Sequence, residues 1–237
     1  MPLRFLVETL AQPQRQISVA AERAHYLCKV MRKQAGDVVD CFDGQGTSFT
    51  AEILTAKSRR CDLRIVTVSP TQQEPLPSLH IGIAILKGQA MDRALQQATE
   101  LGARSIHLLR SARGNVHLSP DRLENKLAHW RRIMAGACEQ SGHLHLPKLH
   151  APLSIQELIE NNSTNIVVLD MAGVPLPSTL QPTTHLMLIG PEGGWDDSER
   201  SLFAQHCLPT FRISNATLRA ETVPTVALAL MEHICRE

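Results

Sequence analysis

Aromatic residues are scarce in this sequence, which holds 2 Trp, 1 Tyr and 5 Phe among its 237 residues. Proteins that bind single-stranded nucleic acid by stacking bases need several aromatic rings on one surface, so this mode of binding is disfavoured. Cysteine is also sparse, and the 6 cysteines form no C-x-x-C pair. Their spacing disfavours a zinc site or a disulfide framework and favours reduced thiols in a cytoplasm.

Long hydrophobic runs are missing as well. No apolar stretch reaches the roughly 18 residues of a membrane span, and the first residues, Met1 to Phe5, lack the pattern of a signal peptide. His143 and His145 lie close together, but no third ligand accompanies them, so no metal site is expected. The sequence thus predicts a cytoplasmic protein with no membrane partner and no metal.

Two common phosphate-binding patterns, G-x-G-x-x-G and G-x-x-x-x-G-K-[ST], do not occur, which gives no support to a Rossmann site or a P-loop. A different glycine-rich segment, Leu188-Ile-Gly-Pro-Glu-Gly-Gly-Trp195, follows the apolar run 185–189. The sequence Asp196-Asp-Ser-Glu199 then predicts the capping box of a helix. A glycine loop between a buried strand and a helix is typical of ligand loops in α/β proteins.

The net charge is only +1, but it is unevenly distributed. Residues 1–149 hold 20 Lys and Arg against 13 Asp and Glu, a net charge of +7. Residues 150–237 hold 4 against 10, a net charge of −6. Such an asymmetry predicts that the first two-thirds of the chain contacts a polyanion, with ordinary scatter of charge as the alternative.

Residues 1–70 are predicted to be rich in β-structure. Segments 38–42 and 48–53 have the pattern of a hairpin, and 61–68 alternates like a half-buried strand. A short helix is predicted after Ser18. Together these features indicate a small β-domain at the start of the chain.

A proline-rich linker, residues 69–79, separates this part from one in which strands and helices alternate. That alternation predicts a mostly parallel sheet covered by helices on both faces. The predicted strands are 79–86, 105–109, 166–169, 185–189 and 211–213, and the predicted helices are 90–101 and 120–141.

Five groups of short motifs run along the chain. They are His25-Tyr-Leu-Cys-Lys-Val-Met-Arg32 with Gly36-Asp37 and Asp43-Gly44-Gln-Gly46; Lys87-Gly88, Met91-Asp92 and Gln97-Ala-Thr-Glu-Leu-Gly102; Trp130-Arg-Arg-Ile133 with Ala137-Cys-Glu-Gln-Ser141; Gly190-Pro-Glu-Gly-Gly194; and Leu218-Arg219-Ala-Glu-Thr222. In this order and spacing they resemble the RsmE type of ribosomal RNA methyltransferase, of the SPOUT superfamily.

The resemblance implies a PUA-like β-barrel that binds RNA in residues 1–70. It implies a SPOUT methyltransferase domain in residues 71–237, with a mostly parallel sheet flanked by helices and a C-terminal trefoil knot. Three loops of the knot, 169–173, 189–194 and 213–219, would hold S-adenosyl-L-methionine (SAM). The implied cofactor-binding residues are Leu169, Met171, Ile189, Gly190, Pro191, Gly193, Gly194, Ile213, Leu218 and Arg219. The three glycines are expected where a backbone-lined pocket leaves no room for a Cβ atom.

The reaction implied by the resemblance is methylation of N3 of a uridine in 16S rRNA, the RNA of the small ribosomal subunit. Loss of the weakly acidic N3 proton leaves negative charge on the uracil, so a proton acceptor and a nearby cation are expected. Arg219 is the candidate cation, with a structural ion pair to Glu221 or Glu192 as the alternative. Glu192 and Glu221 are the candidate proton acceptors, and the alternative for each is a structural role in accepting backbone N–H groups.

Contacts with RNA phosphates require positive charge more than a particular motif. The candidate RNA-binding residues are Arg4, His25, Arg32, Lys87, Arg93, Arg110 and Arg113. The resemblance implies a homodimer that acts on 16S rRNA within the assembled small ribosomal subunit. Trp130 is expected in the core or in the dimer interface rather than stacked on a base.

The sequence departs from the family pattern at Gln89, Gln97 and His143, where an acidic residue, a lysine and an arginine are usual. It also departs at Ser214-Asn-Ala216, in one of the implied cofactor loops. These changes bear on RNA affinity and on how tightly the cofactor is held. Two alternative functions follow: another SPOUT methyltransferase, acting on tRNA or on a ribose 2′-hydroxyl, or an RNA-binding module without catalysis.

Overall fold

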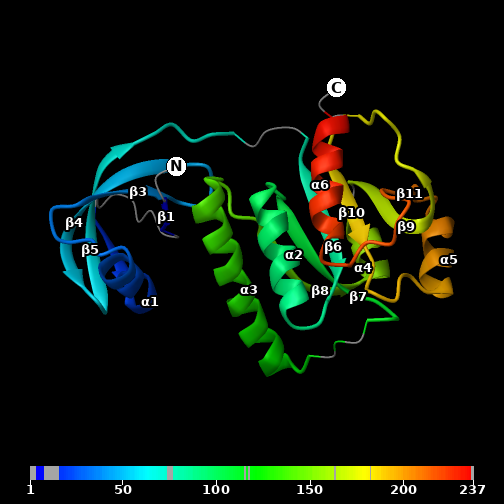
Figure 1. Ribbon diagram of the computed structural model, residues 1–237, viewed down its shortest axis with the longest axis horizontal. Helices are drawn as coiled ribbons and strands as arrows, with labels where there is room; N and C mark the ends of the chain where they lie inside the picture. Colours follow the sequence, from blue (N-terminus) through cyan, green and yellow to red (C-terminus); the bar gives the residue numbers. More distant parts are fainter. Residues whose placement is uncertain are drawn as a thin grey trace. The chain divides into compact units, whose positions relative to one another are not determined.

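The structure is a computed structural model that describes residues 4–7, 16–73, 77–114, 116, 118–162, 164–181 and 183–235. The chain forms two compact units (Figure 1). The N-terminal unit comprises Met1–Glu74 and Cys138–Leu146, and the C-terminal unit comprises Pro75–Ala137 and Pro147–Glu237. The sequence suggested a single boundary at residue 70 and did not indicate that Cys138–Leu146 groups with the first unit.

The N-terminal unit is built on a curled five-stranded sheet. Its strands, in order across the sheet, are β1 (Phe5–Leu6), β3 (Val38–Phe42), β4 (Ser48–Lys57), β5 (Arg60–Val68) and β2 (Gln16–Ala20). β1 and β3 are parallel, whereas the other neighbours are antiparallel. The predicted hairpin is confirmed, because Val38 faces Glu52 and Phe42 faces Ser48 across β3 and β4.

A short helical segment covers the core of this sheet. Helix α1 (Ala21–His25) continues directly into a π-helical turn, η1 (Tyr26–Val30). Ala24 and Leu27 are fully buried in the same cluster as the inward-facing side chains of β4 and β5. The turn ends at Val30, and Arg32, two residues on, has a φ of 55°, in the left-handed region that residues other than glycine rarely adopt.

Glu139, near the end of helix α3 (Pro120–Ser141), is a buried carboxylate of the N-terminal unit. Its Oε1 accepts the backbone N–H of Leu6 at 2.8 Å and the guanidinium of Arg23. Arg23 also donates to the carbonyl oxygen of Leu6 at 2.9 Å. A buried carboxylate is stable only when it is paired, so these contacts account for the grouping of residues 138–146 with the first unit.

The C-terminal unit is built on a six-stranded sheet in which every neighbouring pair is parallel. The order of strands is β11 (Thr210–Arg212), β9 (Asn165–Pro175), β10 (His185–Ile189), β6 (Leu79–Ala84), β7 (Ser105–Arg110) and β8 (Lys148–Ser154). The five predicted strands are present, and the predicted fold class is confirmed. The edge strand β8 was not predicted, because it contains Pro152 and is mostly half-exposed, so it lacks an apolar pattern.

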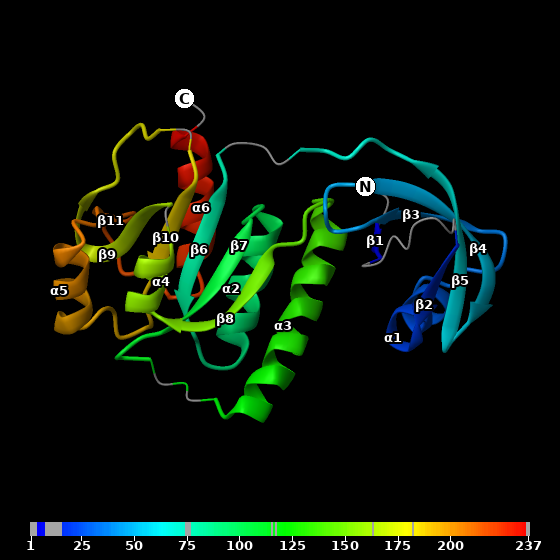
Figure 2. The same cartoon turned by 180° about the vertical axis from the view of Figure 1, so that it is seen from behind.

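Helices cover both faces of this sheet. Helices α2 (Gln89–Glu100) and α6 (Val223–Ile234) pack against each other on one face (Figure 1). Helix α4 (Ile155–Asn161) lies on the other face, as seen from behind (Figure 2). Its apolar residues share a core cluster with Phe203 of helix α5 (Asp197–Gln205).

Because the six strands are parallel, their carboxyl ends lie along one edge of the sheet, the lower edge in Figure 2. Loops from this edge lead into α2, α3, α4 and α5. Open parallel sheets bind ligands at their carboxyl edge. The functional site is therefore expected there.

Candidate functional site

A cavity of about 250 Å³ lies at this edge, beside β9, β10 and β11. All three segments implied to hold a cofactor contribute to its wall. Eight of the ten implied residues line it: Leu169, Met171, Ile189, Gly190, Pro191, Gly194, Ile213 and Leu218. Gly193 and Arg219 are not among the residues of the wall. The first segment, 169–173, is not a loop as expected, since it lies within β9, where its first residue, Leu169, pairs with Ile189 of β10.

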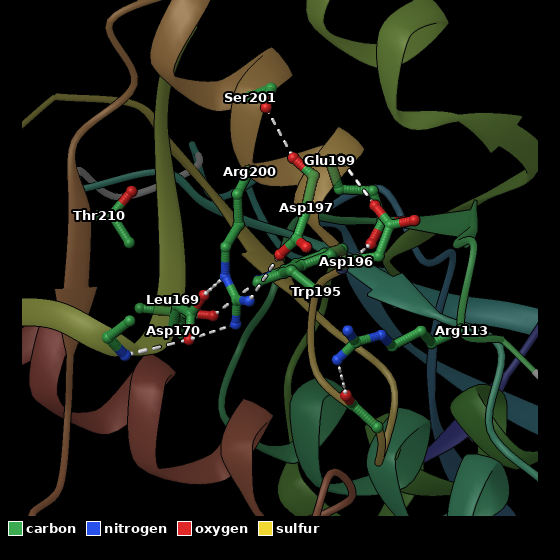
Figure 3. A network of polar contacts seen from close by, with 12 residues as sticks. Arg113, Leu169, Asp170, Trp195, Asp196, Asp197, Glu199, Arg200, Ser201 and Thr210 are labelled. Atoms are coloured by element: carbon green, nitrogen blue, oxygen red, sulfur yellow. Dashed lines mark hydrogen bonds and ion pairs between the residues drawn. The ribbon is translucent and has the colours of Figure 1, made fainter.

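Trp195 joins two of these segments. Its side chain is buried, and its indole Nε1 donates to the carbonyl oxygen of Leu169 at 3.0 Å (Figure 3). A Cβ atom on Gly190 would lie 3.1 Å from the Trp195 ring, closer than side chains normally pack. Phe203 also packs against the indole, edge-on at 5.2 Å between ring centroids. A larger residue at 190 would therefore push against the indole.

A second contact holds the β9 segment. Arg200, on α5, donates from Nε to Asp170 Oδ2 at 2.9 Å and from Nη2 to Oδ1 at 3.5 Å (Figure 3). The Asp170 carboxylate is only 10% exposed and also accepts the backbone N–H of Ala172 at 3.1 Å. Such two-pronged pairing fixes direction as well as distance. No pattern in the sequence indicates this pair, whose members lie 30 residues apart.

The predicted capping box at the start of α5 is confirmed. Asp196 Oδ1 accepts the N–H of Glu199 at 2.7 Å, and Glu199 Oε2 accepts the N–H of Asp196 at 2.8 Å. The first of these bonds keeps the pKa of the Asp196 carboxyl below its usual value. Glu199 is buried, and its other oxygen accepts the N–H of Ala112 at 2.9 Å. The carboxylate thus connects the glycine loop to the turn that follows β7.

Arg113 makes a second bond between the same two segments. Its Nη1 donates to the carbonyl oxygen of Gly193 at 2.9 Å (Figure 3). Arg113 was predicted as an RNA-binding residue, and it is exposed. Its guanidinium therefore lies beside the glycine loop that contributes to the cavity wall.

Glycine at 194 was expected because the pocket leaves no room for a Cβ atom. No protein atom lies within 4 Å of a Cβ atom at this position, so the protein alone leaves space for one, and the expectation that a bound cofactor occupies this space stays a prediction. The residue has a φ of +67°, and its N–H closes a turn onto the carbonyl oxygen of Pro191 at 2.9 Å. A left-handed backbone is unfavourable for other residues by about 1–2 kcal/mol. The constraint at Gly194 is therefore conformational, whereas at Gly190 it is steric.

The three candidate catalytic residues lie near the cavity in different ways. Glu192 is exposed and lines the wall. The side chain of Arg219 is 83% exposed, and its Nη1 lies 4.0 Å from Glu221 Oε1. The ion pair considered as an alternative role for Arg219 is thus present, although an exposed pair at this distance is weak.

The candidate RNA-binding residues differ in their exposure and in the contacts that they make within their own units. In the N-terminal unit, Arg4 is half-buried and donates to the carbonyl oxygen of Gly142 at 3.1 Å, whereas His25 and Arg32 are exposed. In the C-terminal unit, the exposed Arg110 lies 3.3 Å from Glu157. Lys87 and Arg93 are also exposed.

Two of the departures from the family pattern have structural counterparts. Gln97 accepts a hydrogen bond from Thr225 of α6 at 3.0 Å, so it takes part in helix packing. Ser214 and Ala216 both line the cavity, and the Ser214 hydroxyl accepts the N–H of Ala216 at 3.0 Å. Gln89 is the first residue of α2, and His143 is exposed.

Other kinds of site were also considered. In the described part of the chain, no group of three or more His, Cys, Asp or Glu side chains could hold a metal ion. All six cysteines are free. None of the described helices combines the length and the apolar character that crossing a membrane requires.

Comparison with known proteins agrees with the geometry. The family model of the RNA methyltransferase domain matches residues 72–232, and that of the RNA methyltransferase PUA domain matches residues 19–66. Ribosomal RNA small subunit methyltransferase E of Synechocystis is 33% identical over 222 residues, which cover 90% of this chain and 71% of that protein. The enzyme of the same name from Bacillus subtilis is 23% identical, over 97% of this chain and 96% of that protein.

Solved structures show the same fold. A methyltransferase from Legionella pneumophila, in complex with its bound cofactor SAM, has a TM-score of 0.90 and 28% identity, with coverage of 98% of this chain and 97% of that one. Ribosomal RNA small subunit methyltransferase E from Neisseria gonorrhoeae, bound to SAM, has a TM-score of 0.86 and 24% identity, with the same coverage. The chain belongs to the ribosomal RNA small subunit methyltransferase E family of RNA methyltransferases.

Proposed function

We propose that this protein transfers a methyl group from SAM to N3 of a uridine in 16S rRNA. The observation that carries the proposal is the meeting of the three segments 169–171, 189–195 and 211–220 around one cavity at the carboxyl edge of the sheet. Family membership supports it, because relatives with this name are methyltransferases of small-subunit rRNA and two similar structures hold SAM. A uridine N3 target is what the family resemblance implies.

The cavity has the composition that SAM requires. Ligand pockets are mostly apolar with a few polar groups that fix orientation, and here Leu169, Ile189, Ile213 and Leu218 supply apolar walls beside the backbone of the glycine loop. The Glu192 carboxylate suits the positive charge of a sulfonium. When bound, SAM would supply an electrophilic methyl group. These residues, with Gly190, Pro191 and Gly194, would bind it and orient it.

The other side chains of the site would act on the uracil. Removal of the N3 proton needs a carboxylate or a similar acceptor, and Glu192 and Glu221 are the candidates. The resulting negative charge on O2 or O4 needs a cation within hydrogen-bond distance. We assign this role to Arg219, because its exposed guanidinium has only the weak pair with Glu221 and is available for substrate. Arg113 is the next candidate, because its guanidinium donates a hydrogen bond to the glycine loop.

The remaining proposals concern partners and location. The +7 charge of residues 1–149 and the match to an RNA methyltransferase PUA domain support binding of rRNA. The assembled small subunit as substrate is implied by the family resemblance. His25 and Arg32 are the candidates in the N-terminal unit, because both are exposed in the described structure. A homodimer, a C-terminal trefoil knot and a cytoplasmic location complete the proposal; all three are implied by the family resemblance.

The proposed reaction is tested by locating the methyl group. Small ribosomal subunits from a strain that lacks the gene should accept one methyl group from SAM in the presence of the purified protein. Digestion of the RNA and mass spectrometry should identify 3-methyluridine in 16S rRNA and none in tRNA. A methyl group on a ribose 2′-oxygen or on tRNA would favour the alternative methyltransferase, and no transfer despite SAM binding would favour an RNA-binding module.

The glycine loop provides a test of cofactor binding. Gly190→Ala should displace the Trp195 indole, and Gly194→Val should disfavour the left-handed turn. Each variant should bind SAM at least about fivefold more weakly, as expected for a cost of about 1–2 kcal/mol. Gly136→Ala is the matched control, because a Cβ there meets nothing within 4 Å. Calorimetry that finds equal affinities in all four proteins would exclude this loop as the cofactor site.

Arg219→Lys tests the catalytic cation. Lysine keeps the charge but loses the planar fork of donors, so turnover should fall by a factor that corresponds to about 2–4 kcal/mol of activation free energy. SAM affinity should change little, because Arg219 does not line the cavity. Single-turnover kinetics and calorimetry on the same preparation separate the two effects. Normal methylation by this variant would refute the assignment, and Arg113→Lys would then be tested.

A further inference from the structure

Two more cavities lie at the carboxyl edge of the C-terminal unit, beside β6 and β7. Their volumes are about 250 Å³ and about 220 Å³. Ile85, Val116 and Leu118 line both, so the two cavities adjoin across a common wall, and we call them the paired cavities. Neither shares a lining residue with the proposed SAM cavity. The function proposed above leaves them unassigned.

Positive charge lines the paired cavities. Lys87 and Lys126 belong to the first and Arg110 to the second, and among the described residues no carboxylate lines either. Lys126 is half-buried on α3, so its charge is less screened by solvent than that of a surface lysine. Arg110 lies 3.3 Å from Glu157, but both side chains of this pair are at least half exposed, which makes the pair weak. The lining therefore favours an anionic ligand.

The rest of the wall is apolar and firmly held. Trp130 is 2% exposed, and its Nε1 donates to Asp92 Oδ1 at 3.1 Å, so the indole is fixed in the core as expected from the sequence. Leu118 and Leu123 add aliphatic surface. A cationic group beside an apolar wall matches a nucleotide, in which a charged phosphate adjoins a flat base.

Ser111 provides a polar group without a partner. Its hydroxyl oxygen is enclosed and has no hydrogen-bond partner in the structure, and the residue lines the second cavity. The backbone around it is tight, because the N–H of Gly114 donates to the Ser111 carbonyl oxygen at 2.9 Å. An enclosed hydroxyl that lacks a partner is unfavourable in the free protein. Because the residue lines the second cavity, rotation of its side chain about the Cα–Cβ bond would bring the hydroxyl to that cavity, where a polar group of a ligand would satisfy it.

The turn that carries Ser111 also contacts the glycine loop. Ala112 donates its backbone N–H to Glu199, and Arg113 donates to the carbonyl oxygen of Gly193 (Figure 3). The turn 111–114 thus lines the second of the paired cavities through Ser111 and Gly114 and contacts the glycine loop of the SAM cavity through Arg113. A chain of nucleotides could follow this edge from one site to the other.

We infer that the paired cavities bind a nucleotide of the RNA substrate that lies close in the chain to the methylated one. Its phosphate binds beside Lys87 and Lys126, its base or ribose packs on the apolar wall, and a polar group pairs with the Ser111 hydroxyl. This inference rests on the proposed function, since it takes the methylated nucleotide to lie at the SAM cavity.

The test compares Lys126→Ala and Lys87→Ala with Arg131→Ala. Arg131 is an exposed cation of α3 that lines neither cavity, so its loss controls for the overall charge. Each lysine variant should raise the KM and the Kd for small ribosomal subunits about tenfold and lower the salt slope of binding by about one unit. The kcat and the SAM affinity should stay close to those of the wild type. If the control loses as much affinity as the lysine variants, or if none loses any, the subsite is refuted.

Ser111→Ala distinguishes a ligand contact from a structural role. Removing an unpaired hydroxyl without adding bulk should leave the unfolding midpoint unchanged or raise it, yet it should weaken subunit binding several-fold. Binding equal to the wild type would overturn the role of Ser111. Subunit binding is measured without methyl transfer, so failure of the proposed reaction would appear as absent product with these binding differences intact. Failure of the subsite would appear as wild-type KM and Kd for small ribosomal subunits in every variant, with methylation intact.

Discussion

The hydrogen bond from the Trp195 indole to the carbonyl oxygen of Leu169 is the contact on which the proposed SAM cavity most depends. The ring behind this bond is buried, and it lies so close to Gly190 that a side chain there would have to push it aside. One residue therefore sets the distance between the β9 segment and the glycine loop. The Arg200 and Asp170 pair fixes the same segment from α5. A wall held in this way needs little rearrangement when a ligand binds, which lowers the cost of binding.

A second group of contacts joins the glycine loop to the turn after β7. Glu199 serves both as the capping residue of α5 and as the acceptor for Ala112, so the start of the helix and the turn are fixed by one buried carboxylate. Arg113 adds the bond to Gly193. The turn is consequently held between the SAM cavity and the paired cavities. An RNA substrate that occupied both would be positioned by the same framework that holds the cofactor loops, which is how orientation contributes to rate.

Much of the fold could be predicted because it follows from local patterns. Buried parallel strands appear as apolar runs, the capping box is a four-residue signal, and the carboxyl edge follows from strand order. Contacts between distant residues could not be predicted in this way. Glu139 pairs with Arg23 across 116 residues, and Arg113 reaches Gly193 across 80. The sequence also could not distinguish the conformational constraint at Gly194 from the steric constraint at Gly190, because both positions appear in it only as glycine.

The central claim is that the indole N–H of Trp195 holds the cofactor cavity in its binding form. It is tested most directly by calorimetric titration of Trp195→Phe with SAM, with Trp130→Phe as the control. Both variants keep an aromatic ring and lose an indole N–H donor, but Trp130 does not line the SAM cavity. We expect Trp195→Phe to bind SAM about five- to tenfold more weakly, which corresponds to one buried hydrogen bond, and the control to bind normally. Equal SAM affinity in the wild type and in folded Trp195→Phe would contradict the account.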